Sequence, residues 1–360
     1  MGTYKSFSIT VQGISHIKQG KVCQDSSYRY EDASMCITAV ADGHGDDNCF
    51  RSETGASYAI SCAVSGIIEF VNINNPLFSN NPSINNLNSH LPDNWKKAIQ
   101  QLIKHIIASW QIKIEEDFKC HRFSPQELSL VDDKHRKNYE LGINIHKAYG
   151  STLIVCVITP HYWLGIHIGD GRFTVLNQDG NFSQPVPWDD KCYLNVTTSI
   201  CDDDAFERAR FHFSLNAEIP PPIAVFLCTD GLDDNYPVDE NEKHLFRLYR
   251  TIALTFAEDG FEATRNQLAD LINSFATKGK GDDTSIAGCI DMDSLEQIMS
   301  VLQTAMSKEE KNQKKNNLSE GKKENHETMQ RNDTVSINGD GMTHTINSAG
   351  ILKNQNNFIF

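Results

Sequence analysis

Three short apolar runs of this chain each end in, or within two residues of, an aspartate followed by a glycine: Asp42-Gly43, Asp170-Gly171 and Asp230-Gly231. A fourth acidic pair, Asp282-Asp283, stands just before another apolar run. Such runs predict buried β-strands. An aspartate at a strand end, beside a glycine that allows close backbone approach, places a carboxylate at the rim of a sheet, where hard divalent cations find oxygen ligands. Four such rims predict one shared metal site.

Each Asp-Gly pair also has an ordinary explanation, because this dipeptide is typical of turns. Taken alone, any one of the pairs is better explained as a turn than as a ligand. Their recurrence in the same strand–Asp–Gly arrangement favours the metal site.

The remaining pattern predicts a folded domain with a polar tail. Strands are expected over 35–41, 151–158, 162–168, 223–228 and 285–290. Helices are expected over 56–71, 95–114 with Asp93 as N-cap, 245–256, 268–275 and 295–306. The Asn-rich stretch 72–88 predicts an exposed connection. We expect one domain over 1–306 with a helical and Asn-rich insertion at about 72–148. We also expect a disordered polar tail over 307–360, because it has too few apolar residues to compensate for the conformational entropy lost on ordering.

Charge and cysteine content narrow the function. The formal net charge of −14 removes the basic surface that a nucleic-acid backbone requires, so DNA and RNA are unlikely ligands. An anionic substrate would need local cations or metal ions. The ten cysteines contain no Cys-x-x-Cys motif, which predicts reduced, buried thiols. Without a signal-peptide or membrane-spanning pattern, we expect a cytoplasmic protein with no membrane partner.

Six motifs in order resemble those of the metal-dependent protein serine/threonine phosphatases of type 2C, in a divergent, bacterial-type branch. The resemblance covers about residues 6–291. It implies an α+β fold, a four-layer α-β-β-α sandwich of two antiparallel sheets flanked by helices, with Mn²⁺ or Mg²⁺ ions at one end. The motifs are Gln24-Asp25-Ser26, Asp42-Gly43-His44-Gly45, Gly150-Ser151-Thr152, Gly169-Asp170-Gly171-Arg172, Asp230-Gly231-Leu232-Asp233-Asp234 and Gly281-Asp282-Asp283-Thr284-Ser285.

The resemblance assigns roles to individual residues. It implies that Asp42 bridges two metal ions and that Gly43 offers its carbonyl to the second, with Asp25 nearby, directly or through water. Asp230 and Asp282 would complete the coordination of the first ion. Asp170 and Asp234 match positions associated with a third, weaker ion.

His44 is the candidate proton donor. It stands two residues after Asp42, and a histidine with a near-neutral pKa can protonate a departing serine or threonine oxygen. The alternative is that a histidine between two glycines only completes a turn.

Several positions depart from the family pattern. Gln24 stands where Glu or Asn-Glu is usual, which removes a negative charge and predicts weaker metal binding. Gly20 stands where animal members place a phosphate-binding Arg. His16, Lys18 and Lys21 lie in the same segment and are the candidate substitutes. Asp283 replaces a commoner Asn, so either Asp282 or Asp283 could be the ligand; the alignment favours Asp282.

These observations predict a metal-dependent protein serine/threonine phosphatase that activates water with two metal ions. Its partners would be a phosphoprotein substrate and a cognate Ser/Thr kinase. A catalytically weak or silent relative that binds phosphoproteins as a regulator is the alternative. A hydrolase of another phosphoester, such as a nucleotide, is a third hypothesis, but the sequence identifies no base-stacking pocket for it.

Overall fold

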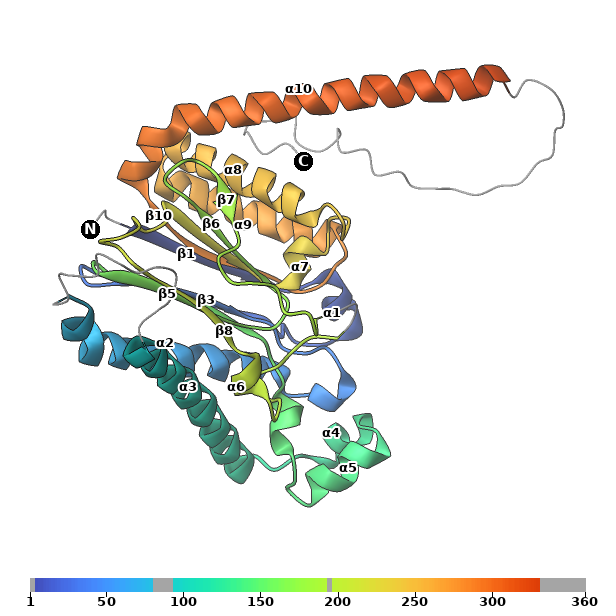
Figure 1. Cartoon of the computed structure of the whole chain (residues 1–360). Helices are drawn as coiled ribbons and strands as arrows, with labels where there is room; N and C mark the ends of the chain where they lie inside the picture. Colours follow the sequence, from blue (N-terminus) through green and yellow to red (C-terminus); the bar gives the residue numbers. More distant parts are fainter. Residues whose placement is uncertain (1–3, 80–92, 193–195, 331–360) are drawn as a thin grey trace.

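The apolar runs form two antiparallel five-stranded sheets in the computed structural model, which describes residues 4–79, 93–192 and 196–330 (Figure 1). The first sheet has the strand order β1 (Tyr4–Val11), β10 (Thr284–Asp291), β9 (Ala224–Cys228), β6 (Arg172–Leu176) and β7 (Phe182–Ser183). The second has the order β2 (Ser26–Glu31), β3 (Cys36–Ala41), β4 (Leu153–Ile158), β5 (Tyr162–Ile168) and β8 (Arg210–Leu215). The five strands expected from the sequence are all present.

Helices cover the outer face of each sheet (Figure 1). On the first sheet lie α8 (Asn241–Asp259), α9 (Phe261–Lys278) and α10 (Met292–Gln330). On the second lie α2 (Ser52–Ser79) and α3 (Asp93–Cys120). The fold is therefore the expected four-layer α-β-β-α sandwich, and that prediction is confirmed.

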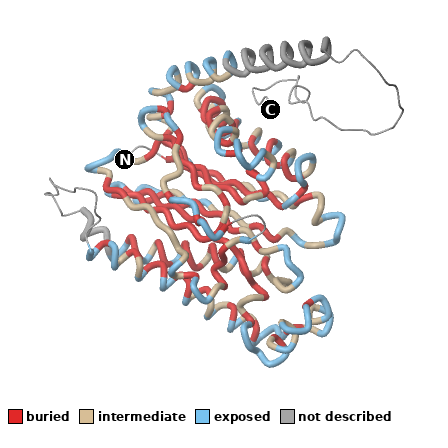
Figure 2. Tube along the Cα trace, turned by 45° about the vertical axis from the view of Figure 1, so that its right-hand side comes forward, coloured by how far each residue is buried: buried red, intermediate tan, exposed pale blue. Residues whose placement is uncertain are grey.

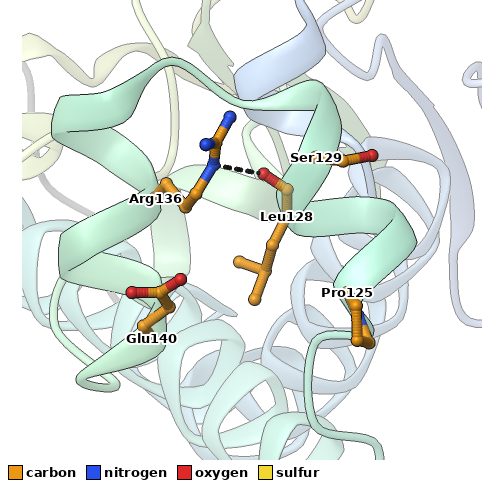
Figure 3. A pocket seen from close by; sticks show the side chains of 5 residues that line it. All are labelled: Pro125, Leu128, Ser129, Arg136 and Glu140. Carbon is orange, nitrogen blue, oxygen red and sulfur yellow. Dashed lines mark hydrogen bonds between the residues drawn. The ribbon is translucent and has the colours of Figure 1, made fainter.

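Three apolar clusters fill the three spaces between these layers, and Figure 2 shows buried backbone running through both sheets. Strand β4 illustrates how one run serves two clusters. Leu153 and Val155 pack with the helices α2 and α3, whereas Ile154 and Cys156 pack between the sheets. A strand buried on both faces reads as a continuous apolar run, because alternate side chains enter different cores.

Short elements occupy the strand connections. At the end of the sandwich that carries the candidate site they include α1 (Ile14–Gln19), the 3₁₀ helix η1 (Asp47–Cys49), α6 (Ala205–Arg208) and α7 (Asp230–Asp233). The expected insertion contains α3, α4 (Pro125–Leu130), α5 (Asp133–Glu140) and the 3₁₀ helix η2 (Ile145–Tyr149). Helix α4 begins at a capping box, in which Ser124 and Glu127 each accept from the other's backbone N–H.

All five expected helices are longer than predicted, and two of them continue into segments expected to be non-helical. Helix α10 continues to Gln330 instead of ending near residue 306, and the expected disorder of the tail stays a prediction. Lys, Glu and Gln are strong helix formers, and a helix already docked at its start can add residues without burying them. Helix α2 likewise continues to Ser79, into the stretch expected as a connection. The rest of that connection, 80–92, and the tail over 331–360 lie outside the described residues.

Helix α2 is apolar enough over Ser52–Ile73 to cross a membrane by length and composition alone. Residues of this stretch, among them Ala56, Ile60 and Ile67, are buried in the cluster against the second sheet. Packing inside the domain therefore accounts for the apolar character of α2.

Candidate functional site

The acidic motifs meet at one end of the sandwich because the sheets are antiparallel. Asp42 follows β3 and Asp25 precedes β2, and these strands pair with Ala41 opposite Ser26. Asp230 follows β9, whereas Asp282 precedes β10, and these two strands also pair antiparallel. In each pair one strand ends where its neighbour begins, so residues far apart in sequence reach the same end of the sandwich, which we call the acidic edge.

Four carboxylates at this edge influence one another strongly. Burial, followed by the charges of Asp230 and Asp25, raises the pKa of Asp42 well above its usual range. Burial also raises the pKa of Asp25, against the hydrogen bond from Thr229, and that of Asp170. Burial and the charge of Asp170 raise the pKa of Asp230 to about 7. Buried like charges are unfavourable unless a cation compensates them.

Asp25 has a buried carboxylate oxygen that a cation would suit. Its Oδ2 accepts a 2.7 Å hydrogen bond from the Thr229 hydroxyl, while its Oδ1 is buried without a hydrogen-bond partner. Carboxylate oxygens are the ligands that Mg²⁺ and Mn²⁺ prefer, so the donor set fits either ion. Over the described ranges, no three His, Cys, Asp or Glu side chains converge as a ready-made metal cage.

The neighbours Asp282 and Asp283 have different environments. The Asp282 side chain is 55% exposed, and its charge contributes to the raised pKa of Asp230. The buried Asp283 carboxylate accepts main-chain hydrogen bonds from Gly13 (2.7 Å) and Gln24 (2.6 Å). Asp283 therefore braces two loops, which leaves Asp282 as the better candidate ligand, in agreement with the alignment.

The Gly150-Ser151-Thr152 motif holds the loop that contains Asp42, Gly43 and His44. Thr152 N–H donates to the Asp42 carbonyl (2.8 Å), and Asp42 N–H donates to the Thr152 hydroxyl (2.9 Å). Gly43 pairs with Ser151, and His44 N–H donates to the Gly150 carbonyl at 3.1 Å. The motif is thus a backbone support for the loop.

Gly43 lies where only a glycine fits. A Cβ placed on it would lie 2.7 Å from the carbonyl oxygens of Gln24 and Ser52. Its own N–H donates to the Gln24 carbonyl at 3.1 Å. Close backbone packing, rather than an unusual φ, therefore explains this glycine.

His44 is partly buried, and its ring lies beside Gly150 together with Cys49 and Cys201. A Cβ on Gly150 would lie 2.6 Å from the His44 ring and 3.2 Å from the Cys201 sulfur. Burial lowers the pKa of His44, and the Asp202 charge opposes that effect. A lowered pKa makes the protonated ring scarcer at neutral pH but a stronger proton donor.

Gln24 replaces the usual acidic residue with a neutral brace. Its side-chain amide donates to the Ser52 hydroxyl (2.6 Å) and to the His44 carbonyl (3.3 Å). The expected loss of one negative charge therefore comes with two hydrogen bonds that hold the His44 loop. Its effect on metal affinity stays a prediction.

The three candidate phosphate-binding residues differ in their surroundings. His16 Nδ1 lies 2.9 Å from Asp283 and its Nε2 lies 3.6 Å from Asp282, so its ring faces carboxylates. Lys18 is exposed on α1 and has no ion pair within the described part of the chain. The Lys21 ammonium donates to the carbonyl of Gly45, directly after His44, at 2.9 Å. Of the three, Lys21 is the one that the fold places beside the His44 loop.

Asp170 and Asp234, the two residues predicted to bind a third ion, differ in how far they are exposed. Asp170 is partly buried, whereas Asp234 is exposed and lies 3.3 Å from the Lys280 ammonium. The charge of Asp234 nevertheless contributes to the raised pKa of Asp170, so the two carboxylates share one region.

Sequence reasoning assigned no role to three residues, of which two support the site and one holds the insertion. Thr229 donates to Asp25 and accepts from Ser285 N–H at 3.0 Å. Arg172, the last residue of the Gly169–Arg172 motif, pairs with Asp233 at 2.6 Å. Arg51 contacts Glu127 at 2.7 Å and Asp117 at 3.2 Å in the insertion. The sequence offered two signals for these roles: Thr229 directly precedes Asp230, and Arg51 follows His44 by seven residues.

Comparison with known proteins identifies the family of this chain. The sequence profile of the family described as Protein phosphatase 2C matches residues 12–273. The chain belongs to the protein phosphatase 2C family. A search of curated proteins finds no match.

Three solved structures similar to this chain are phosphatases. A bacterial serine phosphatase is 14% identical, with a TM-score of 0.43, over 81% of this chain and 98% of that one. The catalytic domain of the serine/threonine phosphatase PstP, in complex with two manganese ions, is 14% identical, with a TM-score of 0.42, over 80% of this chain and 97% of that one. Stp1 from Staphylococcus aureus is 15% identical, with a TM-score of 0.43, over 81% and 95%.

Proposed function

We propose that this chain is a protein serine/threonine phosphatase that uses two divalent cations, Mn²⁺ or Mg²⁺, with a third ion at Asp170 and Asp234. The observation that carries the proposal is the group of mutually repelling carboxylates around the unpartnered Oδ1 of Asp25. Membership of the protein phosphatase 2C family supports the same reaction. The substrate would be a phosphoprotein, with a partner kinase, in the reducing cytoplasm that ten free cysteines suit.

The carboxylates would hold the ions, because an anionic phosphate ester is otherwise repelled from an acidic edge. Asp42, Asp230 and Asp282 would be direct ligands, together with the Gly43 carbonyl, and Asp25 would act directly or through water. When bound, divalent cations neutralise phosphate charge and lower the pKa of a water molecule, the chemistry that ester hydrolysis needs.

Other residues would act on the substrate itself. His44 would donate its ring proton to the departing serine or threonine oxygen. The Lys21 ammonium, held beside the His44 loop by Gly45, would attract phosphoryl oxygens. The loop's backbone bonds to Gly150 and Thr152 would keep these groups in position.

The test is hydrolysis of a phosphothreonine peptide with Mn²⁺ and with a chelator, beside the Asp230→Asn variant. We expect turnover only with Mn²⁺, and a loss of several orders of magnitude in the variant. Mn²⁺ should also raise the melting temperature of the wild-type chain more than that of Asp230→Asn, because a ligand that binds only the folded state stabilises it. Full activity in chelator would contradict the proposal. Metal-dependent stabilisation without turnover would instead indicate the silent regulator.

A further inference from the structure

Trp188 presents an exposed aromatic ring close to the acidic edge. Its side chain is 41% exposed, and the Arg172 guanidinium lies over the ring at 4.2 Å from its centre. The Nε of Arg172 donates to Asp233 at 2.6 Å. Asp233 closes α7, the short helix that begins at Asp230. One arginine therefore joins this ring to the helix that carries a proposed metal ligand.

The residue before Trp188 is fixed to the same edge. Arg210 donates to the Pro187 carbonyl and to the Gly169 carbonyl, each at 2.7 Å. Gly169 directly precedes Asp170. The backbone on one side of the ring is thus tied to the backbone beside a proposed ligand.

The residue after Trp188 is fixed as well. Asp189 is buried, pairs with Arg208 and accepts from the Thr198 hydroxyl at 3.2 Å. That hydroxyl in turn accepts from Gly169 N–H at 3.1 Å. These anchors on both sides, with a 3.3 Å hydrogen bond from the Trp188 indole N–H to the Cys192 carbonyl, hold the partly exposed ring at the surface.

We propose that Trp188, backed by Arg172, is a specificity-determining residue that receives an apolar side chain next to the phosphorylated residue of the substrate. This inference rests on the proposed phosphatase function. The Asp170 and Asp230 carboxylates are polar, so an apolar contact for a peptide has to come from side chains beside them. A fixed tryptophan supplies a large contact area at little cost in side-chain entropy, which is why tryptophan dominates many binding surfaces. An apolar flanking side chain stacked on it should raise kcat/KM about tenfold.

The test compares two phosphothreonine peptides that differ only in having leucine or glycine on both sides of the phosphothreonine. With Mn²⁺, we expect the wild-type chain to prefer the leucine peptide about tenfold in kcat/KM. Trp188→Ala should reduce the ratio to about one, mainly by raising KM for the leucine peptide, and Trp188→Phe should keep most of it. The matched control is Ile112→Ala, which removes a 55% exposed apolar side chain on α3 and should keep the full ratio. A wild-type ratio near one, or an unchanged ratio in Trp188→Ala, overturns the proposal.

A binding measurement separates this inference from the phosphatase function. Fluorescein-labelled phosphonate peptides, in which a methylene replaces the ester oxygen, cannot be hydrolysed. Their affinities for the wild-type and Trp188→Ala chains are measured by anisotropy with Mn²⁺. If the wild-type chain hydrolyses neither phosphopeptide, the proposed function is wrong. A leucine preference in binding that disappears in Trp188→Ala would still support the subsite, whereas equal binding of both peptides would overturn it.

Discussion

The carboxylate of Asp283 accepts a 2.6 Å hydrogen bond from the main-chain N–H of Gln24, which lies 259 residues earlier in the chain. A second main-chain bond from Gly13 ends on the same carboxylate. One buried side chain thus ties the first acidic motif to the last, directly beside the exposed Asp282.

This contrast predicts opposite effects for two neighbouring substitutions. Asp283→Ala leaves two buried N–H groups without an acceptor and should cost about 2–4 kcal/mol in the free energy of unfolding. Asp282→Ala should cost less than about 1 kcal/mol but abolish most activity, because it removes a proposed ligand. Urea unfolding and peptide hydrolysis measure the two effects. Equal destabilisation by both substitutions would contradict the assignment.

His44→Ala should discriminate between substrates by their leaving groups. If His44 donates a proton, its loss should slow a phosphoserine peptide by at least about a hundredfold, because an alkoxide leaves poorly without protonation. An aryl phosphate, whose leaving group needs no proton, should be affected much less. Steady-state kinetics on both substrates tests this, with His105→Ala on the exposed face of α3 as the control. An equal loss on both substrates would indicate a structural role for His44.

Arg51 should make stability depend on pH in the acid range. Burial alone would raise the pKa values of Asp117 and Glu127, but hydrogen bonds from Tyr149 to Asp117 and from Arg51 to Glu127, with the Arg51 charge, lower both. A lowered folded-state pKa gives stability that is present above the unfolded value, about 4, and is lost as the pH falls through the folded value.

We therefore expect Arg51→Ala, which removes a side chain only 12% exposed, to cost about 2–4 kcal/mol at pH 7. The difference from wild type should shrink below about pH 4. Urea unfolding at several pH values measures it, with Arg122→Ala, an exposed neighbour stacked on Phe118, as the control. A difference that stays constant down to pH 3 would mean that the carboxylates contribute little.

Two truncations should separate the docked part of α10 from the rest of the chain. Removing 312–360 should leave turnover of a small phosphopeptide within about threefold and barely change stability. Removing 307–360 also deletes Glu309, which pairs with the largely buried Arg250. That loss should lower the free energy of unfolding by about 1–3 kcal/mol, and Glu309→Gln should reproduce much of it. A large loss of peptide turnover in the shorter deletion would show that the chain end contributes to the site.

The sequence alone was sufficient to predict the buried strands and the acidic residues at their ends. Apolar runs such as Leu153–Ile158 must be strands buried on both faces, and the aspartates at their ends must lie at a sheet edge. The family motifs then assign Asp42, Asp230 and Asp282 as metal ligands, and that assignment stays a prediction. These features depend on local pattern and spacing, which a sequence displays directly.

Only the tertiary structure decided which polar residues serve the site and which support it. The sequence could not tell that His16 faces Asp283 and Asp282, that Lys21 reaches Gly45, or that Gln24 braces the His44 loop. Nor could it show that Arg172 carries Trp188 at the edge of the site. These roles arise from contacts between segments up to 270 residues apart. Such contacts depend on how the two sheets stack. Burial and charge between the stacked segments then decide which partner each side chain contacts. No local sequence pattern contains this information.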